Sequence, residues 1–317
     1  MVAVADIAYV VYDHPDLDEA ERFYRDFGLV TAARRPDELL MRGADGQPYC
    51  YVARKADRPR AVAIGMRVNS REDLERAARE EGVEMEPIDC LGGGWRVRLA
   101  SPMGVDFELV HGCRPLEPLP MRDPLVLNHA SNKARRGQWQ RAVTEPAHVL
   151  RLGHVALVSS DFKAHGQWLQ QRLGMMPSDI LYDGTPDNAL GGFFHCTGGD
   201  DWVDHHTIAL FPAPVCGIHH ASFEVQDIDA QFHGNKFLLA QGRKPLWGVG
   251  RHILGSQVFD YWFDPQGNVV EHFTDGDLVR PGKAPDYHQV ADDSLAQWGP
   301  PISVQAFIER RPPPGAA

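Results

Sequence analysis

The sequence predicts an α+β fold in which four βαβββ modules pair into two similar domains, each a curled mixed β-sheet around a funnel. Three observations predict this fold. Apolar strand-like segments are each followed by an amphipathic helical segment, most of these helical segments stop at a glycine, and the whole pattern occurs twice along the chain. A strand–helix–strand pattern that repeats in this way is typical of structural units that bury a common core.

The first repeated unit matches residues 7–30 with residues 152–175. Each segment has an apolar strand, a turn with an aspartate near the helix start, an amphipathic helix and a glycine just past the helix end. Gly28 and Gly174 stand where a left-handed C-terminal cap is expected. We therefore predict a strand and a capped helix at the start of each half.

The second repeated unit matches residues 61–83 with residues 217–242. Ser70 and Asp73 have the spacing of a capping box, and Gly82 marks the expected end of the helix. This unit predicts a second strand and helix in each half.

The third repeated unit matches residues 101–112 with residues 264–276, and in each a Pro-x-Gly turn precedes a strand. The polar segment 131–146 is the expected link between the halves. The repeats thus predict an N-terminal domain (1–135), a C-terminal domain (140–280) and a C-terminal tail (281–317). The tail is expected to be irregular and, at its proline-rich end, extended or disordered.

The composition excludes several classes of function. The chain has 317 residues and a net charge of −11, so it is long enough for two domains but offers no basic stripe to nucleic acid or to an anionic membrane surface. No apolar run approaches the ~20 residues of a membrane span, and the N-terminal segment lacks the basic start of a signal peptide. The five cysteines form no CxxC pair, which favours a reducing, cytoplasmic environment.

The two halves differ at equivalent positions of three strands. The second half carries histidine, histidine and glutamate there, whereas the first carries tyrosine, alanine and glutamate. The equivalent pairs are Tyr9 and His154, Ala63 and His220, and Glu108 and Glu271. If the modules curl in the same way, these positions converge inside each half, and the second half then has the groups to hold a metal.

Two neutral imidazoles and one carboxylate form the triad of non-haem Fe(II) sites, which leaves positions open for substrate and dioxygen. A closed structural zinc site would need a fourth ligand, usually a thiolate. Taken singly, a residue such as His154 is more often a hydrogen-bonded core histidine than a ligand. His220 alone is more often part of a polar pair on an edge strand, and a glutamate such as Glu271 is usually on a solvated strand face. Their coincidence at three equivalent positions favours the metal site.

Five segments carry a family resemblance: "LGHVAL", "DHHTIALF", "GIHHASFEV", "GVGRHILGSQVFDYWFDPQGNVVEHF" and "TDGDL". They resemble the type I extradiol ring-cleaving dioxygenases of the vicinal oxygen chelate superfamily, such as catechol 2,3-dioxygenase and 2,3-dihydroxybiphenyl dioxygenase. The resemblance covers nearly the whole chain, because that family also has two similar halves. It implies a glyoxalase/bleomycin-resistance/dioxygenase-like fold with the metal in the C-terminal domain and none in the N-terminal domain.

The resemblance implies that His154, His220 and Glu271 bind Fe(II), although the same ligand set suits Mn(II). Successive residues of a strand point to opposite faces, so at most one histidine of "GIHHASFEV" should face the metal. In the family it is the second one. This implies that His220 points inward and that His219 points to the other face.

The resemblance also implies catalytic residues and a reaction. His206 of "DHHTIALF" is the implied acid–base histidine, with His205 as its rival. His252 of "GRH" would lie near the bound substrate, and Tyr261 would donate to the substrate oxygens. The implied enzyme is a homo-oligomer that inserts both atoms of O2 into a catecholic ring next to the diol. The product is a ring-opened semialdehyde or keto acid of aromatic degradation.

The substrate pocket is predicted from fewer residues. Family members that accept a carboxylated side chain often carry an arginine five residues before the "GRH" histidine, where this chain has Trp247. We therefore expect a neutral catechol with an alkyl or aryl substituent, or a bicyclic one, although Arg243 and Lys244 lie close by in the sequence. Trp247 and Cys196 are both expected in the pocket wall.

Other functions remain open at this point. The block "GRHILGSQVFDYW" also resembles enzymes that cleave hydroquinones or trihydroxy aromatics. A glyoxalase or epimerase-like metalloenzyme usually spreads more carboxylate ligands across its modules, and Tyr9 and Ala63 argue against that. A ligand-sequestering protein of this fold is commonly short and lacks the triad, and a 4-hydroxyphenylpyruvate-type dioxygenase differs in the "GRHILGS" block.

Overall fold

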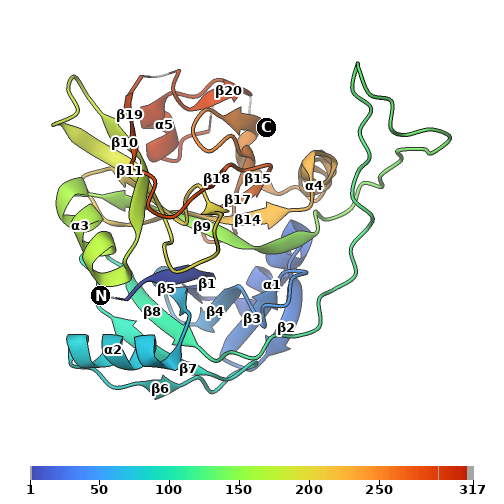
Figure 1. Cartoon of the computed structure of the whole chain (residues 1–317). Helices are drawn as coiled ribbons and strands as arrows, with labels where there is room; N and C mark the ends of the chain where they lie inside the picture. Colours follow the sequence, from blue (N-terminus) through green and yellow to red (C-terminus); the bar gives the residue numbers. More distant parts are fainter. Residues whose placement is uncertain (1, 292, 313–317) are drawn as a thin grey trace.

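The computed structural model describes residues 2–291 and 293–312, and these residues form two large mixed β-sheets (Figure 1). The first sheet comes from the first half and has the strand order β2-β3-β4-β1-β5-β8-β7-β6. Its strands are β1 (Val4–His14), β2 (Val30–Arg34), β3 (Glu38–Arg42), β4 (Tyr51–Lys55), β5 (Arg60–Val68), β6 (Glu86–Pro87), β7 (Trp95–Leu99) and β8 (Asp106–His111). Its helices are α1 (Leu17–Phe27) and α2 (Arg71–Glu81).

The second sheet comes from the second half and the tail, with the order β19-β10-β11-β13-β9-β14-β17-β16-β15-β20. Its strands are β9 (Val149–Ser159), β10 (Met176–Tyr182), β11 (Ala189–His195), β13 (Ile208–Pro212), β14 (Gly217–Val225), β15 (Lys244–His252), β16 (Val258–Phe263), β17 (Val269–Thr274), β19 (Asp286–Gln289) and β20 (Ala296–Trp298). The helices of this part are α3 (Phe162–Leu173), α4 (Ile228–Ala240) and α5 (Val304–Ile308). A small separate sheet pairs β12 (Val203–Asp204) with β18 (Leu278–Val279).

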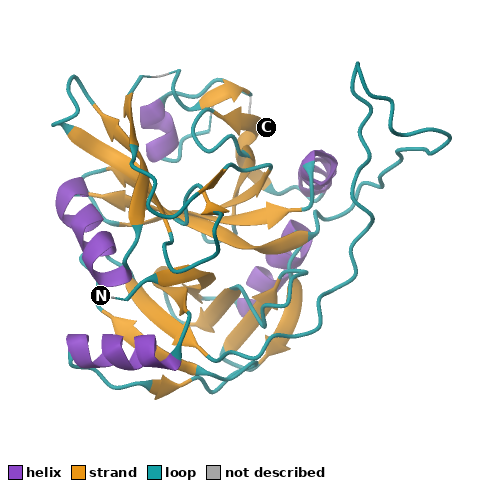
Figure 2. Cartoon of the chain, viewed as in Figure 1, coloured by secondary structure: helices purple, strands orange, loops and turns teal. Residues whose placement is uncertain are grey.

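Both halves repeat the βαβββ module, so the predicted fold class is confirmed. The first strands of the two modules pair antiparallel at the centre of each sheet, β1 with β5 and β9 with β14. On its other side each of these strands has a parallel neighbour: β4 beside β1, β8 beside β5, β13 beside β9 and β17 beside β14. Each of the helices α1 to α4 packs against strands of its own half, whereas α5 lines the cavity of the second sheet (Figure 2). The shared pairing curls both sheets in the same way.

The predicted helix caps are present. Gly28 and Gly174 end α1 and α3 in the left-handed conformation, with φ of 109° and 65°. At Gly28 an added Cβ would lie 1.6 Å from the backbone oxygen of Ala147, so the glycine also permits a close approach of the two halves. Ser70 caps α2 by accepting from the backbone N–H of Asp73, as the capping box predicts.

The halves share one hydrophobic core along this contact. The ring of Phe27 stacks 3.7 Å from that of His272 and meets Phe223 edge-on at 5.7 Å. Tyr24 donates a hydrogen bond of 3.3 Å to Asp264 across the same boundary. Core side chains of both parts pack together, so the packing does not separate two domains. The division into domains 1–135 and 140–280 stays a prediction.

The linking segment is longer than the sequence predicts, and the tail is more regular. Residues 112–148 form no helix or strand. Their start lies along the first half, where the backbone N–H groups of Leu116 and Leu119 donate to the backbone oxygens of Gly46 and Ala44, and a later part projects away as a long loop (Figure 1). The tail is not irregular throughout, because β19 and β20 extend the two edges of the second sheet and α5 packs nearby. Residues 313–317, where a disordered end is expected, lie outside the described residues.

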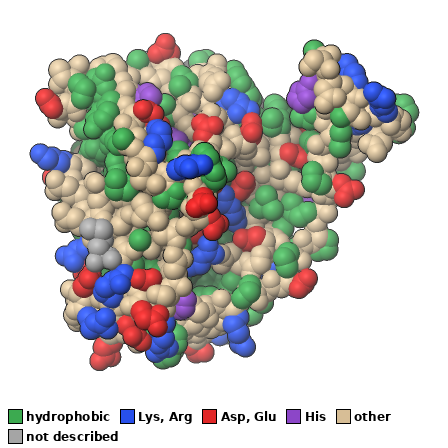
Figure 3. Space-filling model, viewed as in Figure 1, with side chains coloured by type: hydrophobic (Ala, Val, Ile, Leu, Met, Phe, Trp, Pro, Cys, Tyr) green, Lys and Arg blue, Asp and Glu red, His purple; other side chains and the backbone are tan. Residues whose placement is uncertain are grey.

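The surface carries charged side chains of both signs. Acidic and basic side chains are interspersed over the face seen in Figure 3. Within the described ranges, every helix is too short or too polar to cross a bilayer.

Candidate metal centre

Three neighbouring strands of the second sheet carry the predicted ligands. In the register of β9, β14 and β17, His154 stands opposite Ser222, which stands opposite Glu271. His220 precedes Ser222 by two residues, and residues two apart on a strand point to the same face. Strand pairing therefore brings all three predicted ligands to one face of the curled sheet.

The ligand atoms are close enough to share one ion. Glu271 Oε2 lies 3.2 Å from His154 Nε2 and 3.3 Å from His220 Nε2. The three ligand atoms lie within 4.8 Å of one another, and all three side chains are buried. Two ligands at right angles, each about 2.1 Å from an ion, lie about 3 Å apart. The spacing therefore suits a single metal ion.

The carboxylate of Glu271 has the environment of a metal ligand. Among the described residues, neither of its buried oxygens has a hydrogen-bond partner, which is costly for a charged group. Burial would raise the pKa of Glu271, but the His154 and His220 imidazoles hold it well below its usual range. Burial lowers the pKa of His220 to about 4. An ionised carboxylate beside a neutral imidazole such as that of His220 suits the binding of a divalent ion.

The prediction that His219 points to the other face is wrong, because a β-bulge interrupts the alternation of side chains. The register between β14 and β9 shifts between Ile218 and His220. His219 Nδ1 lies 2.7 Å from His220 Nδ1, and His219 Nε2 lies 2.9 Å from the backbone oxygen of Phe307. A carbonyl only accepts, so His219 donates from Nε2 and accepts at Nδ1 from His220. His220 therefore keeps Nε2 free for a metal.

A cavity of about 570 Å³ reaches the ligand histidines. Most of its wall is apolar, and residues of the tail such as Leu295 and Phe307 form part of it. The wall also contains the two ligand histidines and all three predicted catalytic residues, His154, His220, His206, His252 and Tyr261. Within the described part of the chain, no lysine or arginine lines this cavity.

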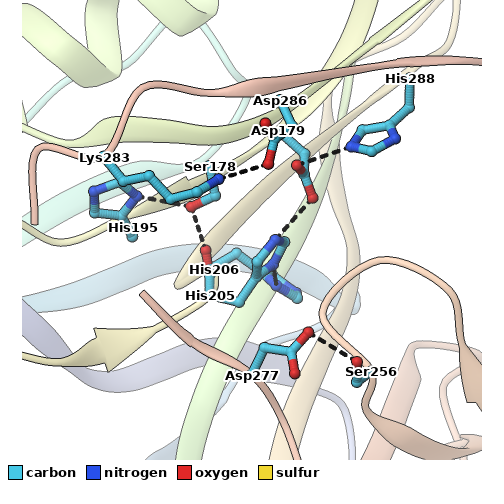
Figure 4. Close-up of polar contacts among 10 residues, drawn as sticks. All are labelled: Ser178, Asp179, His195, His205, His206, Ser256, Asp277, Lys283, Asp286 and His288. Carbon is cyan, nitrogen blue, oxygen red and sulfur yellow. Dashed lines mark hydrogen bonds and ion pairs between the residues drawn. The ribbon is translucent and has the colours of Figure 1, made fainter. Parts of the chain in front are cut away.

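The structure places His206 and His205 differently, although the sequence leaves both as candidates for the acid–base residue. His206 lines the cavity, and its ring lies 4.2 Å from the ring of the predicted ligand His154. Burial, followed by the charges of His154 and His205, lowers the pKa of His206 well below its usual value. His205 lies behind His206, with its Nδ1 3.1 Å from His206 Nδ1 and its Nε2 2.8 Å from Asp179 Oδ2 (Figure 4).

His252 and Tyr261 form a hydrogen-bonded pair in the cavity wall. His252 Nδ1 lies 2.8 Å from the backbone oxygen of Leu295, which only accepts, so this nitrogen carries the proton. His252 Nε2 therefore accepts from the Tyr261 hydroxyl, 2.8 Å away. Burial and the charge of Glu271 raise the pKa of Tyr261 well above its usual value. The phenol is thus a hydrogen-bond donor and the imidazole is neutral.

The two residues expected in the pocket wall lie elsewhere. Trp247 is 1% exposed and stacks behind Tyr261, with ring centroids 5.8 Å apart, because its indole N–H donates to the backbone oxygen of Pro300. Cys196 lines a different, polar cavity of about 420 Å³, and its thiol lies 3.4 Å from the hydroxyl of Thr207. Neither side chain reaches the metal site, so these two pocket predictions are wrong.

Supporting residues of the site were not predicted. Asp179 anchors His205, and the backbone of Phe307 in the tail anchors His219. The two histidine doublets are a sequence signal for this support, because in each doublet the preceding histidine contacts the residue that faces the site. The partners of those preceding histidines are distant in the sequence and carry no local signal.

A buried face of two histidines and one carboxylate beneath an apolar cavity, inside a curled sheet of βαβββ modules, defines a mononuclear metalloenzyme of the vicinal oxygen chelate fold. No protein-family model matches the chain. The chain is 29% identical over 303 residues to metapyrocatechase 2 of Cupriavidus necator, a match that covers 95% of this chain and 90% of that protein. It is 24% identical over 283 residues to the metapyrocatechase of Pseudomonas sp. (strain CF600), covering 83% of each.

Solved structures show the same fold. The Mn(II)-bound glyoxalase from Novosphingobium aromaticivorans has a TM-score of 0.79 at 24% identity and covers 100% of this chain and 96% of its own. Homoprotocatechuate 2,3-dioxygenase from Brevibacterium fuscum, in complex with 3,4-dihydroxyphenylacetate, has a TM-score of 0.78 at 19% identity, with coverages of 97% and 92%. These structures show the fold alone. The metapyrocatechase relatives and the buried triad support an extradiol ring-cleaving dioxygenase, as the sequence resemblance predicts.

Proposed function

We propose that the chain binds a catecholic substrate and inserts both atoms of O2 into the ring next to the diol. The product is a ring-opened semialdehyde or keto acid of aromatic degradation. One observation carries the proposal: the carboxylate of Glu271, without a hydrogen-bond partner in the described residues, lies between two imidazoles beside a cavity that can hold an aromatic ring. The likeness to metapyrocatechase 2 of Cupriavidus necator supports the same chemistry.

The proposed ion is Fe(II), and Mn(II) is the alternative. His154, His220 and Glu271 suit both ions, and one structural neighbour is Mn(II)-bound. When bound, the ion would acidify a diol hydroxyl and hold the diol next to dioxygen. The chain contributes three ligands from one side, two of which line the cavity, so the substrate approaches from the cavity.

Tyr261 and His252 are proposed to act on the substrate hydroxyls. The Tyr261 hydroxyl, kept protonated by its raised pKa, donates to His252 Nε2, and an entering substrate oxygen would replace His252 as its acceptor. His252 Nε2 is then free, and because burial lowers the pKa of His252 it can accept the proton of a diol hydroxyl. The carbonyl of Leu295 holds the His252 ring in this orientation.

His206 is proposed as the acid–base residue for the dioxygen-derived oxygen. It lies beside His154, whereas Tyr261 lies beside His220, with ring centroids 5.1 Å apart. The two proton-handling groups therefore flank different ligands and can serve different oxygens. A proton held at His206 Nε2 and delivered to the leaving oxygen is worth about 10²–10⁴-fold in rate.

The proposed substrate is uncharged, with an alkyl or aryl substituent or a second ring. The cavity of about 570 Å³ is larger than a single ring needs and mostly apolar. It offers a carboxylated side chain no lysine or arginine in the described residues, and Asp293 in its wall would repel one. This argument replaces the one from Trp247, which does not line the cavity.

Glyoxalase chemistry is the competing candidate, because the Mn(II)-bound glyoxalase from Novosphingobium aromaticivorans covers the whole chain. The single carboxylate of the triad and the hydrogen-bonded Tyr261–His252 pair favour the diol reaction. A cytoplasmic homo-oligomer is also proposed from the family resemblance. Light scattering on the purified protein measures the oligomer size.

The experiment is oxygen uptake by metal-free protein reloaded with Fe(II) or Mn(II). The substrates are 4-methylcatechol, 2,3-dihydroxybiphenyl, 3,4-dihydroxyphenylacetate and the methylglyoxal–glutathione adduct. We expect O2 uptake and a yellow product with the two neutral catechols, a kcat/KM at least tenfold lower with the carboxylated one, and no turnover of the adduct. Turnover of the adduct without O2 uptake would contradict the proposal, and preference for the carboxylated catechol would contradict its substrate part.

A further inference from the structure

Residues 124–143 form an arm that projects from the rest of the molecule (Figure 1). Loops longer than about 12–15 residues without secondary structure are usually functional or disordered. This arm is held together by its own hydrogen bonds: Asn128 Oδ1 accepts from the backbone N–H of Arg135 at 2.7 Å, and the Arg135 guanidinium donates to Gln140 Oε1 at 3.0 Å. Among the described residues, the hydrogen bonds of the arm stay within it. The arm therefore has a shape of its own but makes no hydrogen bond to the body.

Both ends of the arm are fixed to α4. Arg122 forms an ion pair with Asp227, the N-cap residue of α4, and its backbone oxygen accepts from Gln226 at 2.6 Å. At the other end, the Thr144 hydroxyl lies 3.2 Å from His233 Nδ1. The arm thus leaves the body and returns to it at the same helix.

The arm exposes large apolar side chains to solvent. Trp139 is 79% and Val143 70% exposed, and Val126 and Leu127 are exposed as well. The guanidinium of Arg141 lies 5.0 Å from the ring centroid of Trp139. Clustered apolar side chains on a surface mark interaction sites, and tryptophan and arginine are enriched among the residues that contribute most to protein interfaces. The arm therefore has the composition of an interface.

The outer face of α4, to which the arm is anchored, is also partly apolar. Phe232, Lys236 and Leu239 are exposed, and their i, i+4, i+7 spacing places them on one face of the helix. A helix face that contacts only water normally carries polar and charged side chains. Phe232 and Leu239 therefore add an apolar patch to the region where the arm begins and ends.

Charge indicates which partner fits this surface. The other 28 of the 32 lysines and arginines stand against all 43 acidic residues, so the chain outside the arm has a net charge of −15. The arm contains no aspartate or glutamate, and Figure 3 shows basic side chains beside hydrophobic ones on the projecting part. Opposite charges attract a basic arm to the acidic body of another copy, whereas that body repels a polyanion. The basic residues of the arm are Lys133, Arg135, Arg136 and Arg141.

We propose that the arm and the outer face of α4 form an interface between two copies of this chain, in which the arm of each copy lies on the acidic body of the other. Such a reciprocal contact is the arrangement of a two-fold dimer. A stable interface takes about 20–30 residues from each side, and the arm supplies 20 before α4 is counted. This inference rests on the homo-oligomer of the proposed function and names its surface, but it does not depend on the proposed chemistry.

The test measures the mass of the full-length protein in solution by sedimentation velocity at several concentrations. Trp139→Ser is compared with Trp202→Ser, a matched control because Trp202 is 52% exposed and the Arg280 guanidinium lies 4.8 Å from its ring centroid. We expect at least two chains per particle in wild type, a dissociation constant at least tenfold higher in Trp139→Ser, and one within twofold of wild type in Trp202→Ser.

Two further variants separate shape from charge. Both ends of the arm meet α4, so a flexible linker of about eight glycines and serines can replace residues 124–143. This form should have half the wild-type mass or less. The double variant Lys133→Glu with Arg136→Glu reverses two exposed charges of the arm, and its dissociation constant should rise at least tenfold. Unchanged or tighter association of the double variant would overturn the choice of the acidic body as the partner surface.

A photoreactive side chain identifies the partner directly. Unlabelled chains with p-benzoylphenylalanine in place of Trp139 are mixed with ¹⁵N-labelled wild type, and we expect cross-links between labelled and unlabelled chains. A monomeric wild type, an unchanged mass in both Trp139→Ser and the linker form, an equal effect in Trp202→Ser, or cross-links only within one chain would each overturn the inference. These readouts need neither metal nor substrate, so an inactive wild type would refute the proposed chemistry while the masses still decide the interface.

Discussion

The two halves of the chain bring a carboxylate to the same point of the same scaffold and use it differently. In the first half Tyr9 and Glu108 flank Gly65 on the strand between them. In the second half His154 and Glu271 flank the equivalent position on β14. Both glutamates are almost fully buried, at 2% and 0% exposed. The scaffold alone therefore does not determine which half binds a metal.

The neighbours of each carboxylate account for the difference. Tyr9 donates a hydrogen bond of 2.6 Å to Glu108, and the guanidinium groups of Arg96 and Arg98 lie 3.5 and 3.3 Å from it. Glu108 is thus satisfied by hydrogen donors, whereas Glu271 faces imidazole nitrogens. Competing donors thus surround the carboxylate of the first half but not that of the second, which favours a metal site in the second half.

The largest difference between the halves is expected from the matched variants Glu271→Gln and Glu108→Gln. Glu271→Gln should lower Fe(II) affinity by more than the about 10–100-fold typical of a change outside the ligand shell, and ring cleavage should fall with it. Glu108→Gln should leave Fe(II) affinity within twofold and instead lower the free energy of unfolding by about 1–3 kcal/mol. Competition titration and denaturant unfolding measure the two effects. Equal loss of affinity in both variants would contradict the distinction.

The next effect concerns the histidine that supports a ligand. His219→Ala removes the acceptor of His220 Nδ1, so we expect Fe(II) affinity to fall about 10–100-fold. The control is His111→Ala, which removes a half-buried histidine of the first half and should change affinity less than twofold. Metal titration of both variants checks this. Unchanged affinity in His219→Ala would mean that the contact with His219 does not orient the ligand.

A smaller effect, common to both halves, is the loss of stability in acid. Burial lowers the pKa of His14 in the first half and of His272 in the second from 6.5 to about 4. Between these values the unfolded chain binds more protons than the folded chain, so stability is full above pH 6.5 and falls toward pH 4. Unfolding of the metal-free protein at several pH values measures this. The free energy of unfolding should depend less steeply on pH in His272→Asn. A free energy of unfolding that does not fall between pH 6.5 and pH 4 would contradict the lowered pKa values of the two histidines.

The smallest effect is expected from a double variant of the first half, which should not create a second metal site. Tyr9→His with Ala63→His copies the second-half histidines into the first half. Arg96 and Arg98 still neutralise Glu108, so we expect one metal ion per chain before and after the change. Elemental analysis of the dialysed protein gives the ratio. Two ions per chain would show that the arginines do not prevent binding.

The sequence predicted that the three proposed ligands converge, because their convergence depends on local rules. Strands alternate side chains with a period of two, and the repeat places equivalent positions on equivalent strands. A comparison of the halves, together with the family resemblance, was therefore enough to predict that His154, His220 and Glu271 lie together, as they do in the structure. The helix caps at Ser70 and Gly28 were predictable for the same reason, since each cap depends on residues close in sequence.

The rest depends on contacts that are distant in sequence. The bulge at His219 adds a residue without any sequence mark and reverses the expected side-chain direction. Trp247 was misplaced because its indole bonds to Pro300 in the tail, and the tail was expected to be irregular. Asp179 lies 26 positions from His205 in the sequence, and His205 follows β12 outside any strand, so no local pattern marks their contact.

Anomalous diffraction at the iron edge from crystals grown with Fe(II) would locate the ion itself. We predict one strong peak per chain, within coordination distance of His154 Nε2, His220 Nε2 and a Glu271 oxygen, and no peak beside Glu108. A strong peak beside Glu108, or a peak that none of the three second-half ligands reaches, would contradict the metal site on which the proposed chemistry depends.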